Sequence, residues 1–203
     1  MRYQICVSGA HAVDAVSPSH VLAAELGRAI ASRGKTLMTG ATVGLPWDAA
    51  KAAFAVKGPH SGLSVGFSPA SSFREHVVTY KLPTKEFDYI NFTGMYYVGR
   101  DSHLVRSSDA VITVGGGMGS LHEFSTALES HKVCGVLLGS GGLADFIPKI
   151  LDKIKSPGVK DVIYDNNPER LVDRIIATLD EKYADFHQHG TDHDISSKRS
   201  GGG

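Results

Sequence analysis

The chain has 203 residues, of which 42% are hydrophobic, and it is therefore long enough to bury one sizeable core. Lysine plus arginine and aspartate plus glutamate number 21 each, and this formal net charge of zero argues against a dedicated nucleic-acid-binding or membrane-surface protein, which would normally carry a basic stripe. No apolar run approaches the roughly 20 residues that a transmembrane helix needs.

Short apolar runs alternate with longer amphipathic patterns along the chain, which is typical of strands that alternate with helices. In chain order, the patterns predict a strand over 3–7, a helix from 17–19 to 32, a strand over 36–39, a helix over 46–56, strands over 63–67 and 89–92, a helix over 95–106, a strand over 110–114, a helix over 119–129, a strand over 133–138, a helix over 143–154, a strand over 162–164 and a helix over 168–184. The first helix places Val21, Leu22, Leu26 and Ile30 on one face. Residues 70–86 show little periodicity and are expected to form a loop.

Strands that alternate with helices predict a parallel sheet, because parallel strands need crossover connections. The strands carry no charges, which fits a sheet that is covered by helices on both faces. We therefore expect an α/β fold of three layers, α/β/α, with a single domain over residues 1–184. Residues 185–203 are polar and rich in histidine, serine and glycine, which predicts a disordered tail.

The two cysteines and the N-terminal residues indicate the cellular compartment in which the protein is expected. Cys6 and Cys134 lie in apolar, strand-like runs, and we expect them to be small core residues of a reduced protein rather than a disulfide framework. The first residues are strand-like at once and lack the pattern of a signal peptide. A cytoplasmic protein is therefore expected.

A glycine-rich segment follows the strand over 110–114, with four glycines in five positions, then a serine, then Glu123. In an open α/β sheet, ligands bind at the carboxyl ends of the strands. A helix that begins there offers unpaired backbone N–H groups and a partial positive charge, and glycine lets an anion come close to the backbone. The segment therefore predicts a phosphate-binding loop. Its residues are Gly115, Gly116, Gly117, Met118, Gly119 and Ser120.

Other interpretations of this segment fit less well. A plain turn would not need four glycines, which cost conformational entropy. The segment is not a P-loop, because no lysine follows at the required spacing. The first strand ends in Ser8 and Gly9 without the later glycines of the dinucleotide fingerprint, which argues against an NAD-dependent oxidoreductase. We expect no cofactor and no metal site, since the histidines of the tail show no fixed ligand spacing.

Two further strand ends should lie beside the glycine-rich segment, because consecutive βα units tend to be neighbours. Ser8 and Gly9 end the first strand, and Gly40 and Gly44 lie in the turn after the second. Together these residues would line a groove for a whole nucleotide.

The run from Arg100 to Glu123 resembles the LOG ("Lonely guy") family, whose members were long labelled lysine decarboxylases. The signature of that family is an arginine, an Asp-Ala strand start and then Pro-Gly-Gly-x-Gly-Thr-x-x-Glu. Asp109, Ala110 and residues 116–120 stand at the matching positions without gaps. Residues 39–46 and 66–69 are similar to two further turns of the family, and the resemblance covers roughly residues 3–154.

The chain departs from this pattern at four positions. Gly115 replaces a proline, Ser120 a threonine, and His122 the first of two paired acids. Asp101 replaces the lysine of the cytokinin-activating members, which reverses a charge. The resemblance is therefore nearer to a bacterial branch with Gly-Arg-Asn and Val-Gly-Gly-Gly.

The resemblance implies a Rossmann-like, doubly wound sheet and usually a homodimer. For the best-known members it implies hydrolysis of the N-glycosidic bond of a purine or cytokinin-type nucleoside 5′-monophosphate, which releases a free base and ribose 5-phosphate. Relatives also carry molybdenum cofactor or act as nucleotide sensors, so a carrier or sensor is the alternative, and Asp101 favours it. Binding of single-stranded DNA on a related sheet is disfavoured by the zero net charge.

The resemblance makes Glu123 and Arg100 the catalytic candidates. Glycosidic cleavage passes through an oxocarbenium-like state, which the Glu123 carboxylate would stabilise while it orients water. Arg100 would bind the phosphate or ribose, or stabilise the departing base. The alternatives are a first-turn acid favoured by the helix dipole, and an ion pair of Arg100 with Asp101 or Glu123. Trp47 is expected either to stack on a base or to be buried.

Overall fold

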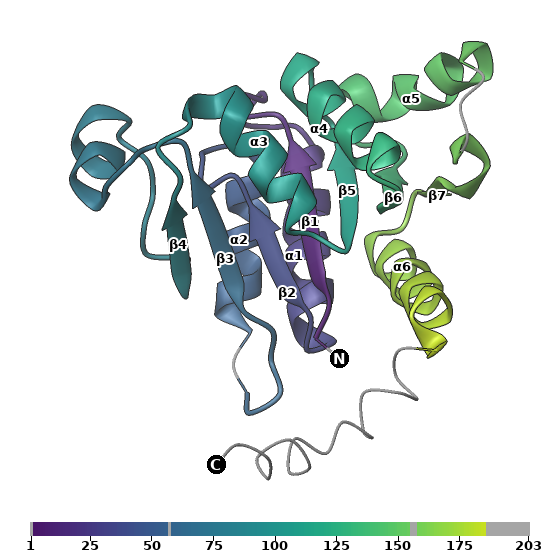
Figure 1. Ribbon diagram of the computed structural model, residues 1–203, viewed down its shortest axis with the longest axis horizontal. Helices are drawn as coiled ribbons and strands as arrows, with labels where there is room; N and C mark the ends of the chain where they lie inside the picture. Colours follow the sequence, from purple (N-terminus) through teal and green to yellow (C-terminus); the bar gives the residue numbers. More distant parts are fainter. Residues whose placement is uncertain (1, 57, 155–157, 186–203) are drawn as a thin grey trace, which may run out of the picture.

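The computed structural model describes residues 2–56, 58–154 and 158–185. Within these residues, seven parallel strands form one sheet (Figure 1). The strands are β1 (Gln4–Gly9), β2 (Thr36–Thr39), β3 (Ser64–Ser68), β4 (Tyr89–Phe92), β5 (Ala110–Val114), β6 (Val133–Leu137) and β7 (Ile163–Asp165). Their order across the sheet is β4-β3-β2-β1-β5-β6-β7, so the direction in which strands are added reverses between β1 and β5.

Helices cover both faces of this sheet. They are α1 (Ser19–Ser32), α2 (Leu45–Ala55), α3 (Tyr96–Arg106), α4 (Met118–Glu129), α5 (Gly142–Lys153) and α6 (Pro168–Lys182). Figure 1 shows these helices on the two faces of the sheet. One apolar cluster joins the sheet to α1, α2 and α6, and a second joins the opposite face to α3, α4 and α5. The fold is thus a three-layer α/β/α, Rossmann-like, doubly wound sheet, as the alternation of strands and helices predicts.

Strands β5 and β6 are buried along their whole length, which explains why they read as uncharged runs. All five residues of β5 and all five of β6 are buried. Cys6 and Cys134 lie in the second cluster as free thiols. A parallel strand that is covered on both faces has no solvent side on which a charge would be stable.

The pairing of β1 with β5 extends β1 beyond the expected end. Ser8 pairs with Thr113 and Gly9 with Val114, so both residues belong to the strand rather than to the turn after it. This register brings the end of β1 level with the end of β5. Consequently the residues after both strands meet at one edge of the sheet.

One residue of the first helix lies elsewhere than expected. Val21 is 61% exposed, whereas Leu26 and Ile30 are completely buried. The buried stripe of α1 runs through Ala23 instead, and α2 packs so closely that a Cβ at Gly27 would collide with its backbone. Packing of α2, rather than the apolar character of each residue, therefore sets the buried face.

The segment over 70–86, expected to be a loop, contains a short π-helix, η1 (Glu75–Thr79), and lies beyond the β4 edge of the sheet (Figure 1). His76 is completely buried there: its Nδ1 lies 2.8 Å from Oγ of Ser68, and its Nε2 lies 3.0 Å from the carbonyl oxygen of Pro83. A single hydrogen-bonded histidine, and not an apolar stripe, anchors this turn. That is why the periodicity of the sequence does not reveal it.

The remaining expected boundaries agree with the structure to within two residues. A second short helix, η2 (Val159–Asp161), precedes β7 and was not expected. The predicted tail over 185–203 lies, except for its first residue, outside the described residues. Across the part of the chain that the structure describes, no helix is both long and apolar enough to cross a bilayer.

Candidate functional site

A cleft of about 490 Å³ lies at the carboxyl ends of the central strands, where the strand order reverses. This is the place at which open α/β sheets bind their ligands. Its walls come from the end of β1, the turn after β2, and the first turns of α2, α3 and α4. The lining comprises residues 7–12, Gly40, Thr42, Pro46, Tyr97, Arg100, Asp101, residues 116–120 and Glu123.

The first turn of α4 forms one wall, with Gly116, Gly117, Met118, Gly119 and Ser120 in the lining. Gly117 is the N-cap residue, and no side chain caps the helix. The first N–H groups of an α-helix have no intrahelical partner, and they carry its positive dipole end. This wall is therefore a site of partial positive charge built from backbone.

Two of these glycines are not required by the packing of the protein. A Cβ built at Gly117 or Gly119 would meet no other atom within 4 Å. Most residue types would fit the fold at these two positions. The lack of a side chain instead keeps the space in front of the α4 N-terminus open to a ligand.

Gly44 and Gly115, which were predicted to belong to the site, do not line the cleft. Both have positive φ angles, 84° and 56°, which suit glycine. A Cβ at Gly44 would collide with the backbone of Ala10, and one at Gly115 would lie 2.9 Å from Leu45. These two glycines join the strand ends to α2 and so shape the cleft without lining it.

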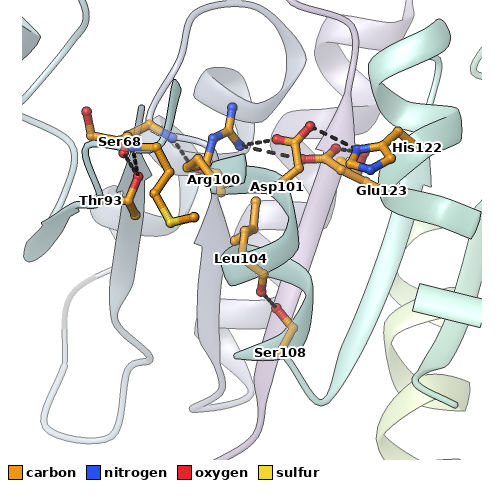
Figure 2. Close-up of polar contacts among 12 residues, drawn as sticks. Ser68, Thr93, Arg100, Asp101, Leu104, Ser108, His122 and Glu123 are labelled. Carbon is orange, nitrogen blue, oxygen red and sulfur yellow. Dashed lines mark hydrogen bonds and ion pairs between the residues drawn. The ribbon is translucent and has the colours of Figure 1, made fainter. Parts of the chain in front are cut away.

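Arg100 enters the cleft from α3 and is only 5% exposed (Figure 2). Its Nη1 lies 3.1 Å from Oδ1 of Asp101 and 3.5 Å from Oε1 of Glu123. The guanidinium lies against the backbone of Gly40, where a Cβ would collide with it. Its Nε is buried and has no hydrogen-bond partner within the described protein. Arg100 therefore compensates two acids at the cleft.

Glu123 lies on α4, one turn from the glycine-rich wall, and is 8% exposed. Oε2 accepts a hydrogen bond from the hydroxyl of Ser8, at the end of β1. Burial, followed by the negative charge of Asp101, raises the pKa of Glu123 to about 7, although Arg100 and Ser8 act in the opposite direction. Near neutral pH both the acid and the carboxylate are populated, as general acid–base chemistry requires.

Asp101 links this pair to a histidine. Its Oδ2 lies 3.4 Å from Nδ1 of His122, which is adjacent to Glu123 on α4 but points another way (Figure 2). The side chain of Asp101 is 10% exposed and that of His122 39%. One polar cluster beside the cleft thus contains Arg100 and Asp101 from α3, and His122 and Glu123 from α4.

Sequence reasoning missed eight residues of the lining: the apolar Val7, Ala10, Ala12 and Pro46, and the polar or aromatic His11, Thr42, Tyr97 and Asp101. The sequence held a signal for two of these residues. Tyr97 lies three positions before Arg100 on the same helix, and Asp101 follows Arg100 directly. His11 and Thr42 lie in irregular turns, for which the sequence pattern offers no direction. Trp47 does not line the cleft: its ring packs against the core under α2, with Nζ of Lys51 4.4 Å from its centre.

No group of three or more His, Cys, Asp or Glu side chains that could hold a metal ion occurs among the residues that the structure describes. The polar and aromatic side chains at the cleft are instead a cation, two carboxyl groups, hydroxyls, the imidazole of His11 and the ring of Tyr97. Together with the backbone of α4, they suit an organic anion.

Comparison with known proteins places the chain in a family. The family model LDcluster4, described as the SLOG cluster4 family, matches residues 2–172. No curated protein matches the chain.

Several solved structures share the fold. The X-ray structure of TM1055 is 23% identical, with a TM-score of 0.72, and the match covers 88% of this chain and 99% of that one. The molybdenum cofactor binding protein from the phototrophic bacterium Rippkaea orientalis is 26% identical, with a TM-score of 0.69, covering 88% and 98%. The molybdenum cofactor carrier protein from Chlamydomonas reinhardtii is 25% identical, with a TM-score of 0.67, covering 87% and 99%.

Proposed function

The chain belongs to the SLOG cluster4 family, and on this basis we propose that its cleft binds a phosphate-bearing nucleotide and hydrolyses the N-glycosidic bond of a nucleoside 5′-monophosphate. One observation carries the proposal. The uncapped N-terminus of α4 and the carboxyl group of Glu123, one helical turn apart, face the same cleft. A phosphate at the helix end would place the attached sugar beside an acid.

The proposed reaction uses this chain's own groups. The oxygen of a water molecule bonds to the anomeric carbon while the C–N bond breaks and leaves its electron pair on the base. Glu123, as a carboxylate, takes a proton from that water and, as an acid, returns it to the departing base nitrogen. The same carboxylate stabilises the positive charge that develops on the sugar. A carboxylate has about four lone-pair positions, so the bonds to Ser8 and Arg100 leave room for this water.

Arg100 has in this proposal the part that the sequence offered as the alternative, an ion pair with Asp101 and Glu123. Its guanidinium already lies between two acids, Asp101 and Glu123. It therefore keeps the Glu123 carboxylate in place and partly ionised, because a nearby cation favours the charged form.

A carrier that holds its ligand without turnover is the second candidate. Asp101 favours it, because a further negative charge in the cleft raises the pKa of Glu123 and lowers its fraction of carboxylate. The likeness at 26% and 25% identity to a molybdenum cofactor binding protein and a molybdenum cofactor carrier protein also supports it. In that case a pterin-type cofactor is the cargo, and its phosphate would lie at the N-terminus of α4.

Incubation with a panel of nucleoside 5′-monophosphates, including AMP, tests the two candidates against each other. Chromatography of the products should show a free base and ribose 5-phosphate in equal amounts, and Glu123→Gln should stop their release while the protein stays folded. Glu129→Gln is the matched control, because Glu129 is an exposed acid of the same helix. Recovery of every ligand intact, at one equivalent per chain, would exclude hydrolysis and favour the carrier.

The proposal also covers the cellular location and the oligomeric state of the protein. We expect it to act in the cytoplasm, as a homodimer or higher homo-oligomer, without binding nucleic acid or membranes. Exposed apolar side chains at the start of α3, among them Tyr96 and Val98, would suit contact with a second copy. Light scattering coupled to gel filtration measures the mass, and a monomer at micromolar concentration would contradict this expectation.

A further inference from the structure

Tyr97 is the only Phe, Tyr or Trp residue among the described residues that line the cleft. It lies in the first turn of α3, and the spacing of three and four residues puts it on the same helix face as Arg100 and Asp101. Tyr97 is 48% exposed, whereas Arg100 and Asp101 are buried. A flat ring with free surface therefore stands in a cleft that is otherwise lined by small or polar groups and one methionine.

The ring of Tyr97 is held by a second ring from the π-helical segment. Tyr80 contacts it edge to face, with ring centres 5.8 Å apart and planes at 77°. Tyr80 follows η1 directly, and its backbone N–H donates to the carbonyl oxygen of Glu75 over 3.0 Å. The buried His76 anchors the same turn. The segment over 70–86 therefore affects the cleft, because it carries Tyr80, which contacts Tyr97.

We propose that Tyr97 is the stacking surface for a planar heterocyclic base, so that the cleft selects ligands in which a phosphate is joined to an aromatic ring system. This inference rests on the proposed function in one respect: it takes the first turn of α4 as the phosphate end. The base end is then α3, which lines the cleft through Tyr97, Arg100 and Asp101. The volume of about 490 Å³ lies within the range of small-molecule sites.

Stacking predicts different changes in binding affinity for two matched ligands. Loss of an aromatic partner weakens base binding by roughly 5- to 150-fold. Ribose 5-phosphate has the same phosphate and sugar as a nucleotide but no base, so it lacks the contact. A stacking residue therefore changes the ratio of the two affinities, whereas a residue with a general structural role lowers both alike.

Calorimetric titration with formycin 5′-monophosphate and with ribose 5-phosphate tests the proposal. Formycin 5′-monophosphate keeps a purine-like base, and its carbon–carbon glycosidic bond is not hydrolysed, so turnover does not disturb the measurement. The proteins are the wild type, Tyr97→Ala, Tyr97→Phe and Tyr97→Leu. Tyr96→Ala is the matched control, because Tyr96 is the adjacent tyrosine, 72% exposed and outside the lining.

Tyr97→Ala should weaken formycin 5′-monophosphate at least 5-fold and change ribose 5-phosphate less than 2-fold. Tyr97→Phe should bind within about 3-fold of the wild type because it keeps the ring, and Tyr97→Leu should follow the alanine variant. If Tyr97→Ala is unstable, the leucine variant carries the comparison. An unchanged ratio of the two affinities would overturn the inference while leaving the phosphate site intact.

Two other outcomes separate the inference from the proposed function. Failure of the wild type to bind either ligand would overturn both. Binding of both ligands without release of base from AMP would remove only the hydrolysis and leave the stacking role standing. The mass of Tyr97→Ala is measured alongside: a change of oligomeric state with equal loss of both ligands would make Tyr97 a subunit contact and overturn the inference.

Discussion

Nη1 of Arg100 lies 3.5 Å from Oε1 of Glu123, and both side chains are buried at the cleft. Asp101 contacts the same Nη1 at 3.1 Å, so one cation compensates two acids. Burial and the charge of Asp101 together outweigh this cation, because the pKa of Glu123 is still raised to about 7. The protonation state of Glu123 is therefore the property of the site that measurements over a range of pH test most directly.

The stability of the protein should depend on pH through Glu123. The folded pKa, about 7, lies above the ordinary value of 4.5, so the folded state holds the proton more tightly than the unfolded state. The stabilising contribution is complete below about pH 4.5 and is lost as the pH rises through 7, by up to about 3 kcal/mol. Urea unfolding from pH 5 to pH 8 measures this slope.

Glu123→Gln should flatten this pH dependence and raise the free energy of unfolding at pH 8 relative to the wild type. Histidines titrate in the same range, so Glu129→Gln, in which an exposed acid is removed, is the reference. A slope that survives unchanged in Glu123→Gln would show that Glu123 has an ordinary pKa.

Asp101→Asn should lower the pKa of Glu123, because it removes the neighbouring charge that raises it. If the protein hydrolyses nucleotides, the acid side of the pH–rate profile moves to lower pH. Binding of ribose 5-phosphate at pH 8 should become roughly 3- to 10-fold tighter, since one negative charge leaves the cleft. A pH profile and calorimetry measure the two effects, and His122→Asn is the control because His122 contacts Asp101 but does not line the cleft.

Gly119→Ala should separate ligand binding from folding. No atom of the protein lies within 4 Å of a Cβ at this position, and alanine favours a helix over glycine by roughly 0.5–1 kcal/mol. The melting temperature should stay the same or rise, while affinity for ribose 5-phosphate should fall about 10-fold or more as the methyl group enters the cleft. Unchanged affinity would mean that the phosphate does not lie at the N-terminus of α4.

Gly116→Ala is the matched opposite of that variant. Gly116 has a φ of 95°, and its Cβ would lie 2.6 Å from Ser120. Both strain and collision should lower the free energy of unfolding, by about 1–3 kcal/mol. Differential scanning calorimetry of the two glycine variants side by side would reveal the contrast, and equal melting temperatures would contradict it.

Asp165→Asn should destabilise the protein without changing the cleft. Asp165 ends β7 and is buried, and its carboxylate accepts hydrogen bonds from Arg170 at 2.6 and 2.8 Å and from the backbone N–H of Asn167 at 2.9 Å. The bond to Arg170, above all, holds the pKa of Asp165 well below its usual range. We expect a loss of about 1–3 kcal/mol at pH 7.

The pH dependence of that loss has a definite sign. A depressed folded pKa stabilises the protein above the unfolded pKa, and the contribution disappears as the pH falls through the folded value. The difference between wild type and Asp165→Asn should therefore shrink below about pH 4. Asp173→Asn, which breaks a more exposed pair with Arg33, should cost less than about 1 kcal/mol.

The class of fold and the place of the cleft follow from the amino-acid sequence alone. Uncharged strands that alternate with amphipathic helices have few arrangements other than a parallel sheet covered on both faces, because parallel strands require crossovers. The glycines after β5 marked a helix start at the carboxyl edge of that sheet. Both are local properties of the chain, and a short window of residues carries them.

Which side chains meet depends instead on how the helices and strands pack. Arg100, Asp101 and Glu123 share a cluster because α3 and α4 pack side by side on one face of the sheet, and Ser8 joins them because β1 pairs with β5. Likewise, Tyr97 lies in the cleft and Trp47 under α2, although both are aromatic residues near a helix start. Sequence periodicity sets on which face of its helix or strand a residue lies. Where that face points, and how deeply it is buried, depend on the packing of elements far apart in the chain.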